Sequence, residues 1–512
     1  MADLRIFSIS LLCFLSASII AWVYHNHDLY VLFRMPETED KMSHEIVIGV
    51  LSARENTAQR QAIRDTWGQY IRDHSKLRGK MLARFIIGNR GCEIPHEFRE
   101  DQYSCQSMLL KTKNVNLEKE MVAFDFQMPL SKNYGRRTSS GEYYGIDFKV
   151  NYAVIVKKLG VYAAGSLEQQ CSVTLYDTWS QEPVISATFP PGDPSELQDG
   201  YRYRNVETYL FPKDFEGTIV VGPLSEDIQL STISQNGRQI HNTHRILSIR
   251  SFLRTCKTAT FPNEIGLFNL PFLPGNFIFE IYKPEEVEGM LNSSAALVQS
   301  QIEVNRQESQ ALKDEQQHHN DLLLVDAVDI YRNIPHKLLH FFHWVTSTTE
   351  ANFIIKTDDD CFMNVNAIME MIQDGQVAAN SRTWWGNFRT NWPLDVLGKW
   401  AEHDYPSPVY PAFACGSGNL LTRDLVQWIA QNSQFLHTYQ GEDVSMGIWL
   451  ASILPTYLND RRWQCDDECQ EDALVLPEQS PQQLRVSWQN WIRCQNPCSC
   501  DWLNKHPRSC SE

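Results

Sequence analysis

The sequence has no excess of basic residues. Its 46 Lys and Arg residues are outnumbered by 62 Asp and Glu residues, so the formal net charge is −16 at pH 7. Proteins that bind nucleic acids neutralise phosphates with Lys and Arg, so this balance predicts no nucleic-acid partner. Charge is also moderate in amount, since 21% of the residues are charged and 43% are hydrophobic. This composition excludes a disordered chain, and 512 residues are enough for two or three globular domains.

Charged residues are absent from one long run, Ile6 to Tyr24. The run is long enough to cross a bilayer and longer than the apolar core of most signal peptides. The positive side chain before it, Arg5, is partly offset by Asp3, so the orientation signal is weak. We expect a signal anchor that leaves residues 1–5 in the cytosol and the bulk of the chain in the lumen. A cleaved signal peptide is the alternative interpretation.

Cysteine and glycosylation signals agree with a lumenal chain. Of the 13 cysteines, Cys13 lies inside the apolar run, which leaves an even number for disulfides. Cys-x-x-x-Cys spacings near the C-terminus also occur in zinc sites, but an oxidising lumen favours bridges. These C-terminal cysteines are Cys465, Cys469, Cys494, Cys498, Cys500 and Cys510. A single N-glycosylation sequon begins at Asn292, and we expect it in a lumenal loop.

The first part of the expected lumenal chain has an α/β pattern. Buried strands are predicted at residues 45–51 and 84–88, with a helix over residues 57–70 between them. Such a β–α–β opening favours a parallel sheet with nucleotide chemistry at its carboxyl edge. Arg60 and Arg64 lie four residues apart on the predicted helix and can face a diphosphate there. The alternative is that both are solvated helix arginines.

The periodicity changes between residues 110 and 290. Short β-type runs separated by turns replace the helical pattern, which indicates a β-rich module of the sandwich type without a catalytic constellation. Residues 295–319 return to a helical pattern, residues 321–328 predict another buried strand, and residues 335–346 predict an amphipathic helix. The simplest interpretation is a β-rich insert between the second and third strands of one α/β domain.

Three aspartates follow the next apolar strand directly, in the run Phe353 to Asn364. Asp358 and Asp360 are two residues apart, so an extended backbone would place both carboxylates on one face. So much negative charge at a strand end is costly unless a cation neutralises it, and oxygen ligands suit Mg²⁺ or Mn²⁺. The run therefore predicts a metal site for a nucleotide diphosphate. A solvated acidic turn is the alternative.

Two further stretches follow the acidic run. Residues 404–418 predict a loop rich in proline and glycine, in which Gly416 and Gly418 allow the backbone to approach a ligand closely. Glu442 and Asp443 precede an apolar helix, at the positions of an N-cap and a first turn. Helix capping is therefore the alternative to a chemical role for this acidic pair.

Taken in order, these motifs resemble the β-1,3-glycosyltransferases of glycosyltransferase family 31. The resemblance covers roughly residues 45–105 and 310–465. The motifs that carry it are the segments 60–67 (RQAIRDTW), 325–333 (VDAVDIYRN), 356–362 (KTDDDCF), 385–388 (WGNF), 410–418 (YPAFACGSG) and 441–447 (GEDVSMG). It implies a Rossmann-like transferase domain of the GT-A type, here interrupted by the β-rich insert and preceded by a transmembrane anchor.

The resemblance also implies an activity. The insert narrows it to members that transfer N-acetylgalactosamine from UDP-GalNAc to a terminal β-linked N-acetylglucosamine. The implied acceptor is a glycan on an O-mannosylated glycoprotein of the dystroglycan type. The implied location is the membrane of the Golgi apparatus, the endoplasmic reticulum or both, as a single-pass type II protein with a lumenal catalytic domain. A galactosyl- or N-acetylglucosaminyltransferase of the same family, or a lectin-like glycan-binding protein, are the alternatives, and in a mixed interpretation the insert binds the acceptor.

The family also implies roles for individual residues. Asp360 is implied as a ligand of Mn²⁺ and Asp358 as a contact of the metal or the UDP ribose, with Asp359 between them. Inversion at the sugar needs one general base, implied to be Asp443, with Glu442 as the runner-up. The residues implied to lie near the donor nucleotide or to line the sugar pocket are Ser52, Arg60, Arg64, Asp326, Gly416 and Gly418. Related enzymes often add a late histidine as a metal ligand, but after Asp443 this chain has only His506.

These inferences divide the chain into seven segments. They are a cytosolic tail (1–5), the anchor (6–24), a stem (25–44), the first part of the transferase domain (45–110), the β-rich insert (111–294), the second part of the transferase domain (295–490) and a cysteine-rich tail (491–512).

Overall fold

The structure is a computed structural model of the whole chain. It describes residues 42–109, 117, 119–125, 135–137, 141–162, 169–223, 229–231, 241–242, 246–257, 260–262, 264–266, 275–395, 398–402 and 404–500. The predicted anchor, Cys13, Cys510 and His506 therefore lie outside the described residues. Within the described part, no helix is both long enough and apolar enough to cross a bilayer.

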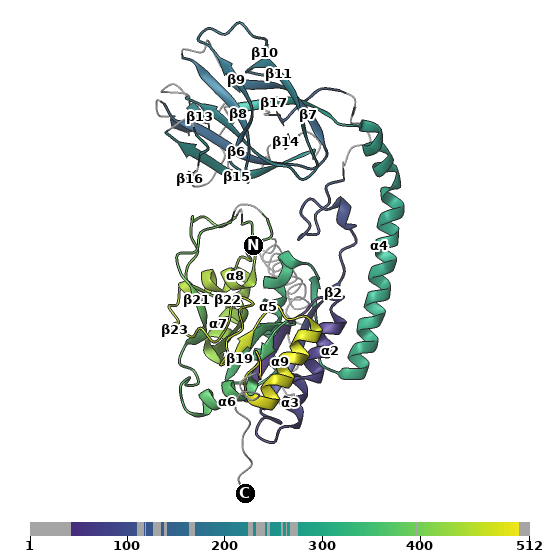
Figure 1. The fold of residues 1–512 in the computed structure, drawn as a ribbon, viewed down its shortest axis with the longest axis vertical. Coiled ribbons are helices and arrows are strands. Elements are labelled where there is room, and N and C mark those ends of the chain that lie inside the picture. Colours follow the sequence, from purple (N-terminus) through teal and green to yellow (C-terminus); the bar gives the residue numbers. More distant parts are fainter. Residues whose placement is uncertain are drawn as a thin grey trace, which may run out of the picture.

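A seven-stranded sheet forms the centre of the lower body in Figure 1. Its order is β18-β2-β1-β19-β22-β21-β23, and the first four strands are parallel to one another. β22 pairs antiparallel with β19 and with β21, and β23 pairs parallel with β21. The strand bounds are β1 (Ile46–Leu51), β2 (Met81–Arg90), β18 (Leu322–Val328), β19 (Phe353–Asp358), β21 (Thr383–Arg389), β22 (Phe413–Thr422) and β23 (Thr456–Asn459). The predicted mixed α/β class is confirmed.

Helices cover both faces of this sheet, because successive side chains of a strand point to opposite faces. On β1, Ile46, Ile48 and Val50 join the core beneath α2, α3, α6 and α9, whereas Val47 and Leu51 join the core beneath α5, α7 and α8. The helix bounds are α2 (Thr57–Asp65), α3 (Trp67–Asp73), α5 (Ile334–Thr348), α6 (Val365–Gln373), α7 (Arg423–Asn432), α8 (Glu442–Ala451) and α9 (Pro481–Cys494).

Two predicted element boundaries are wrong. The expected helix over residues 57–70 is divided at Thr66, whose hydroxyl donates to the carbonyl of Ala62 at 2.7 Å and whose backbone leaves the helical conformation. The expected loop over residues 404–418 ends at Phe413, where β22 begins. The glycines in that segment are compatible with a strand here because neighbouring side chains occupy the space of their missing Cβ atoms.

A second body contains two antiparallel sheets that share one apolar core, shown at the top of Figure 1. We call residues 121–281 the β-rich module. Its first and last strands pair with each other, with Val122 opposite Ile278. The five-stranded sheet contains β10 (Leu197–Gln198), β11 (Tyr201–Phe211), β7 (Val154–Tyr162), β17 (Gly275–Ile281) and β3 (Met121–Val122). The six-stranded sheet contains β16 (Glu264–Gly266), β15 (Leu247–Cys256), β6 (Tyr143–Val150), β12 (Glu216–Gly222), β8 (Cys171–Asp177) and β9 (Pro183–Phe189).

Three small two-stranded ladders complete the sheets. They are β13 (Gln229–Ser231) with β5 (Gly135–Arg137), β14 (His241–Asn242) with β4 (Phe124–Asp125), and β20 (Phe362–Met363) with β24 (Val475–Leu476).

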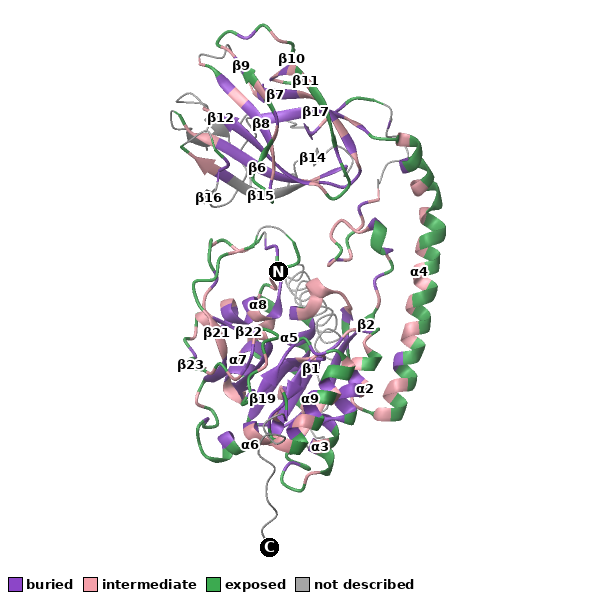
Figure 2. Cartoon of the chain, in the orientation of Figure 1, coloured by how far each residue is buried: buried purple, intermediate pink, exposed green. Residues whose placement is uncertain are grey.

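One long helix, α4 (Pro284–His319), returns the chain from the β-rich module to the central sheet. It has 36 residues, and Figure 2 shows that most of its surface is exposed. Asn292 lies in this helix and is exposed, so the expectation of a loop at the sequon is wrong. The helix boundary predicted at residue 295 lies well inside α4, whose first turns include Val287, Met290 and Leu291 packed against the core of the β-rich module.

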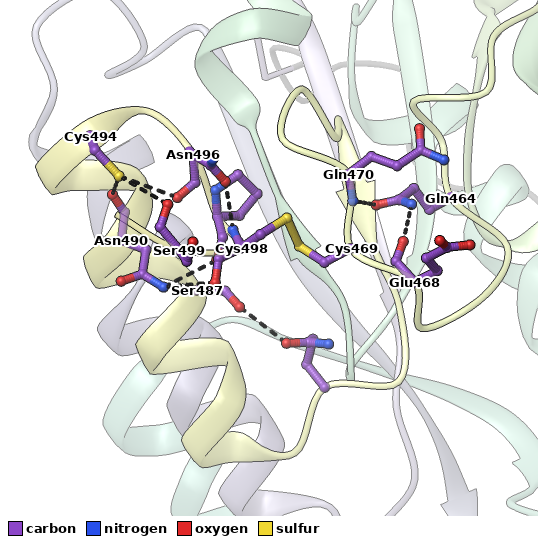
Figure 3. Close-up of a disulfide and its surroundings, with 12 residues drawn as sticks. Gln464, Glu468, Cys469, Gln470, Ser487, Asn490, Cys494, Asn496, Cys498 and Ser499 are labelled. Atoms are coloured by element: carbon purple, nitrogen blue, oxygen red, sulfur yellow. Dashed lines mark hydrogen bonds between the residues drawn. A yellow bond between two sulfur atoms is a disulfide. The ribbon is translucent and has the colours of Figure 1, made fainter. Parts of the chain in front are cut away.

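Four disulfides confirm the preference for bridges over zinc among the described cysteines. The pairs are Cys92–Cys105, Cys415–Cys465, Cys469–Cys498 and Cys494–Cys500. Figure 3 shows the Cys469–Cys498 bridge tying the loop at Gln470 to the segment that follows α9, where Asn490 donates to the carbonyl of Cys498 at 3.3 Å. Among the described cysteines, Cys171 and Cys361 are free.

Candidate active site

Four elements meet at one edge of the central sheet. β1 and β19 end there in register, with Leu51 opposite Asp358, and β22 begins beside them, with Thr357 opposite Gly418. The N-terminus of α8 contacts the same edge, through Glu442. In open α/β sheets, ligands bind outside the carboxyl ends of the strands. The sheet topology thus brings together the two acidic motifs of the sequence, which lie more than eighty residues apart in the chain.

A buried lysine connects these two motifs. Lys356 is fully buried, and its Nζ donates to Glu442 Oε1 at 2.6 Å, pairs with Asp358 Oδ1 at 3.0 Å and also donates to the carbonyl of Gly416. Burial by itself lowers the pKa of Lys356, but the charges of Asp358 and Glu442 outweigh burial and raise the pKa above its usual range. Sequence reasoning missed this residue, although a lysine inside an otherwise apolar strand was a usable signal.

The second carboxylate of α8 has a different environment. Asp443 is half-buried, and its Oδ1 accepts a hydrogen bond from the backbone N–H of Val444 at 2.7 Å. Burial, and then the charge of Glu442, raise the pKa of Asp443 to about 7. The N-cap of α8 is Gly441, and Glu442 and Asp443 lie in the first turn of the helix, so the capping alternative is wrong for the N-cap position and confirmed for the first turn.

The two glycines of the predicted sugar pocket have different surroundings. A Cβ atom at Gly416 would lie 3.3 Å from Glu442 Oε1 and 3.9 Å from Asp443 Oδ2, so Gly416 adjoins the acidic cluster. A Cβ atom at Gly418 would instead lie 3.1 Å from the ring of Trp463. The structure therefore brings Gly416, but not Gly418, to the carboxylates.

The three consecutive aspartates do not continue as a strand. β19 ends at Asp358, and Asp359 and Asp360 form a turn, so the premise of an extended backbone through Asp360 is wrong. Burial raises the pKa of Asp358 to about 7, the charge of Lys356 opposes this rise, and the charges of Glu442 and Asp360 add to it. Asp358 and Asp360 are thus close enough to repel each other.

The middle aspartate faces the protein interior. Asp359 is buried and accepts a hydrogen bond from Asn56 Nδ2 at 3.0 Å, and its backbone N–H donates to the carbonyl of Leu51 at 3.1 Å. Burial raises the pKa of Asp359, and hydrogen bonds from Ser52 and Asn56 oppose that rise. Asp359 therefore holds the turn after β1 against the end of β19.

The two helix arginines are buried, so the expectation of solvated side chains is wrong. Arg60 is fully buried, with its Nε and Nη2 each 2.8 Å from an oxygen of Glu315 and its Nη1 2.9 Å from Ser52 Oγ. Arg64 pairs with Asp321 at 2.8 Å and with Glu315 at 2.6 Å. Both guanidinium groups therefore form salt bridges with carboxylates at the C-terminal end of α4 or just after it.

α4 engages a third arginine close by. Arg54 is buried, and it donates to Glu308 Oε2 at 3.2 Å and to Ser309 Oγ at 2.7 Å. Arg54 also donates to the carbonyl of Gly88 at the end of β2. Together with Arg60 and Arg64, it fixes α4 against the segment that follows β1.

The motif at the end of β18 contains one aspartate that is exposed to solvent and one whose side chain is buried. Asp326 has a 75% exposed side chain and pairs with Arg90 at 3.1 Å, so the structure does not bring it to the acidic cluster. Asp329 is buried and accepts from Lys337 Nζ at 2.6 Å, and Lys337 also donates to the carbonyl of Ser52. Sequence reasoning selected Asp326 because the spacing alone does not separate the two.

Two tyrosines lie near the catalytic candidates, Tyr410, which is buried, and Tyr331, which is half-buried. Burial raises the pKa of Tyr331, and the charges of Glu442 and Asp443 add to this effect. Burial also raises the pKa of Tyr410, with smaller contributions from the charges of Glu402 and Asp443. Sequence analysis gave neither a role, and both lie inside motifs that it had identified.

The described residues contain no group of three or more His, Cys, Asp or Glu side chains placed to hold a metal ion. Two carboxylates, Asp358 and Asp360, adjoin each other at the sheet edge. This set can supply two oxygen ligands, which leaves most of the coordination of a divalent cation to other molecules.

Comparison with known proteins agrees with this arrangement. Residues 293–456 match the family model described as Galactosyltransferase. The UDP-GalNAc:beta-1,3-N-acetylgalactosaminyltransferase 2 of Danio rerio is 37% identical over 484 residues, covering 94% of this chain and 96% of the relative. The protein of the same name from Homo sapiens is 37% identical, covering 89% of each.

The similarity to other members is shorter. The beta-1,3-galactosyltransferase 6 of Mus musculus is 32% identical over 183 residues, which is 35% of this chain and 56% of that protein. The near full-length matches therefore include the β-rich module. The sheet edge with its paired acidic motifs and the near full-length identity lead to one conclusion: this chain belongs to the family of the UDP-GalNAc:beta-1,3-N-acetylgalactosaminyltransferase 2 proteins.

Proposed function

We propose that this protein transfers N-acetylgalactosamine from UDP-GalNAc to a terminal β-linked N-acetylglucosamine, with inversion at the anomeric carbon. The names of its near full-length relatives support this donor and this β-1,3 linkage. An acceptor on an O-mannosyl glycan of a glycoprotein belongs to the same proposal.

The observation that carries the mechanism is the asymmetry between Glu442 and Asp443. Glu442 is buried and paired with Lys356 at 2.6 Å, so its carboxylate is engaged and its position is fixed. Asp443 is more exposed, and among the described residues it makes no salt bridge. A general base must be unpaired, accessible and close in pKa to the working pH, and Asp443 meets these conditions better. We therefore assign Asp443 as the base and Glu442 as a positioning residue.

The proposed step is a single displacement. The acceptor hydroxyl oxygen forms a bond to the anomeric carbon of the donor as the bond from that carbon to the UDP oxygen breaks. The hydroxyl proton passes to Asp443, and the electron pair of the broken bond leaves with UDP. Attack from the face opposite UDP converts an α-linked donor sugar into a β-linked product. The absence of a side chain at Gly416 lets its backbone lie close to Glu442 and Asp443, which supports a sugar pocket on this side of the cluster.

Asp358 and Asp360 suit a divalent cation shared with the diphosphate. Two adjoining carboxylates whose charges repel each other favour a cation, and Mg²⁺ or Mn²⁺ is commonly bound by one or two carboxylates plus substrate phosphates. When bound, Mn²⁺ would act as a Lewis acid that stabilises the charge on the departing UDP. Ser52, which follows β1 and accepts from Arg60, and Asp359, in the turn after β19, are joined by a hydrogen bond and would shape the nucleotide side of the same edge.

The same proposal includes the location of the protein. We assign a GT-A-type transferase domain, interrupted by the β-rich module, to the lumenal side of a Golgi or endoplasmic reticulum membrane, with residues 6–24 as the anchor. The four disulfides support an oxidising compartment.

A donor screen tests the proposed function. The full chain, solubilised in detergent, is given Mn²⁺, an aryl β-N-acetylglucosaminide and one UDP-sugar at a time. We expect product with UDP-GalNAc alone, loss of product with EDTA, and recovery when excess Mn²⁺ is added. Product with UDP-galactose or UDP-N-acetylglucosamine instead would overturn the donor, and glycan binding without turnover for any donor would favour a binding protein.

A further inference from the structure

A polar cleft lies beside the acidic cluster. It has a volume of about 710 Å³ and is lined by three parts of the chain. The β-rich module contributes Lys149, Asp214 and other polar residues. The α/β body contributes Gln440 and residues near it. The third part, which we call the connector, is residues 92–108, closed by the Cys92–Cys105 disulfide.

The connector contacts both other walls, so the cleft has defined sides. Toward the β-rich module, its Glu100 accepts from Ser248 Oγ at 2.6 Å, and its Glu97 carbonyl accepts from Lys213 Nζ at 3.1 Å. Toward the α/β body, its Asp101 accepts from Arg332 Nε at 3.0 Å. The backbone N–H of Arg332 also donates to the carbonyl of Tyr103 at 3.1 Å.

One residue of the cleft lining lies close to the proposed base in the chain. Gln440 lines the cleft, and its backbone N–H is held by Glu402 at 2.8 Å. Two residues separate Gln440 from Asp443, so the Cα atoms of these two residues are at most about 11 Å apart. Arg332 also lines the cleft. Burial and the charge of Asp443 raise the pKa of the preceding residue, Tyr331. One oligosaccharide can therefore lie in the cleft while its end reaches Asp443.

The lining favours a neutral ligand rich in hydroxyl groups. Acidic residues outnumber Lys and Arg in it, so a phosphate or sulfate would be repelled. The acidic residues are Glu97, Glu100, Asp101, Asp214, Glu216, Glu402 and Asp404, and the basic residues are Arg99, Lys149, Lys213 and Arg332. Amides of Gln102 and Gln106 and the ring faces of Tyr103 and Tyr439 add the partners that sugar hydroxyl and C–H groups need.

One buried group in the lining also points to a ligand. Gln440 is only 7% exposed, and its Oε1 makes no hydrogen bond of good geometry. The hydroxyl of the neighbouring Tyr410 interacts with the side chain of Gln440. A buried polar atom without such a partner costs free energy, which a hydroxyl group of a bound ligand can offset.

From these observations we infer that the cleft binds the sugar units that follow the terminal N-acetylglucosamine of the acceptor. This inference rests on the proposed function and gives the β-rich module a role in acceptor recognition. The terminal sugar binds at Asp443, and the next sugars extend between the module and the connector. A neutral glycan matches the lining better than an anionic one.

The test compares a short and a long acceptor on three forms of the full chain. The acceptors are an aryl β-N-acetylglucosaminide and a disaccharide with β-linked N-acetylglucosamine on mannose. The test variant, Lys149→Ala with Asp214→Ala, removes a salt bridge of 2.8 Å that lines the cleft. The matched control, Lys157→Ala with Glu280→Ala, removes a salt bridge of 2.9 Å in the same module that does not line the cleft. Both changes keep the net charge.

We expect the unmodified chain to have a higher kcat/KM for the disaccharide than for the aryl glycoside. In the test variant, the ratio of these two values should fall by about tenfold, as for one or two lost hydrogen bonds. The control should keep it, and the KM for UDP-GalNAc should not change in either variant. Equal use of both acceptors by the unmodified chain, or an equal loss for both acceptors in the test variant, would overturn the inference.

A second readout does not depend on turnover. Saturation-transfer NMR with the disaccharide should show contact at the mannose unit for the unmodified chain and the control, and weaker contact for the test variant. Contact confined to the N-acetylglucosamine unit would overturn the inference even where transfer is normal. A preference between acceptors that depends on the polypeptide carrying the glycan would also overturn it. Absence of transfer with a normal mannose signal would instead count against the proposed function alone.

Discussion

The central sheet and the β-rich module each bury a cation beside carboxylates, with different consequences. In the module, Arg254 contacts both oxygens of Asp147 at 2.8 and 2.9 Å, and Thr218 Oγ1 adds a hydrogen bond of 2.6 Å. One charge balances one charge, and no acidic group is left over. Such a pair is structural.

At the sheet edge the charges do not balance. Lys356 is shared between Glu442 and Asp358, and Asp360 and Asp443 add two more carboxylates without salt bridges among the described residues. The local excess of negative charge raises the pKa of Asp358 and Asp443 and favours a cation from outside the chain. A buried ion pair with equal charges therefore does not indicate a functional site. A cluster in which carboxylates outnumber cations does.

The largest effect is expected from Asp443→Asn. It removes the proposed base without removing the carboxylates at the metal position, so transfer should fall by about 10²–10⁴-fold while UDP-GalNAc still binds. Initial rates and isothermal titration with UDP-GalNAc measure the two quantities. Asp374→Asn, on an exposed residue at the end of α6, is the control. Turnover within tenfold of the unmodified chain would show that another group takes the proton.

The comparison of the two buried cations can be tested with matched substitutions. Lys356→Met and Arg254→Met each leave a buried carboxylate without its partner, so each should cost about 3–5 kcal/mol in the stability of its own part. Hydrogen exchange resolved along the chain measures each part separately. Only Lys356→Met should also impair transfer by folded molecules. If Arg254→Met impaired transfer equally, the distinction between the two sites would be lost.

Asp360→Asn tests whether the excess charge serves a cation. The change removes one of two adjoining carboxylates, so we expect Mn²⁺-dependent binding of UDP to weaken by about tenfold or more. Calorimetric titration of UDP at several Mn²⁺ concentrations gives the affinity. An unchanged dependence on Mn²⁺ would exclude Asp360 as a ligand.

The smallest predicted effect is on the pH profile. A base acts only when it is deprotonated, so with a pKa of about 7 for Asp443 the rate should fall as the pH drops below 7, by about tenfold per unit. Because the charge of Glu442 raises this pKa, Glu442→Gln should move the midpoint to lower pH in the activity that remains. A midpoint that stayed in place or rose would contradict the coupling between these two carboxylates.

The sequence predicted the residues of the sheet edge better than their surroundings. Strand ends and acidic motifs are local features, so Asp358, Glu442 and Asp443 could be identified from pattern and resemblance. The environment of Arg60 and Arg64 could not be predicted in this way. Their partners Glu315 and Asp321 lie about 250 residues further along the chain, in α4 and just after it.

Other differences have the same origin. The spacing of the motif at the end of β18 does not distinguish Asp326, which is exposed, from Asp329, which is buried on Lys337. The mixed α/β class followed from the periodicity of the strands. The polar connector and the Cys92–Cys105 bridge carried no periodicity that would have placed them beside the acidic cluster.

The pairing of β3 with β17 has a consequence for the order of events during folding. β2 and β18 are neighbours in the central sheet, yet residues 91–321 separate them in the chain. Closing so long an unfolded loop would make this strand pair slow to form. Once β3 and β17 have paired, the two ends of the module lie side by side, and the loop that remains is much shorter, because it contains only residues 91–120 and 282–321. We therefore expect the module to form before the β2–β18 contact, so that its folding rate limits the assembly of the catalytic edge.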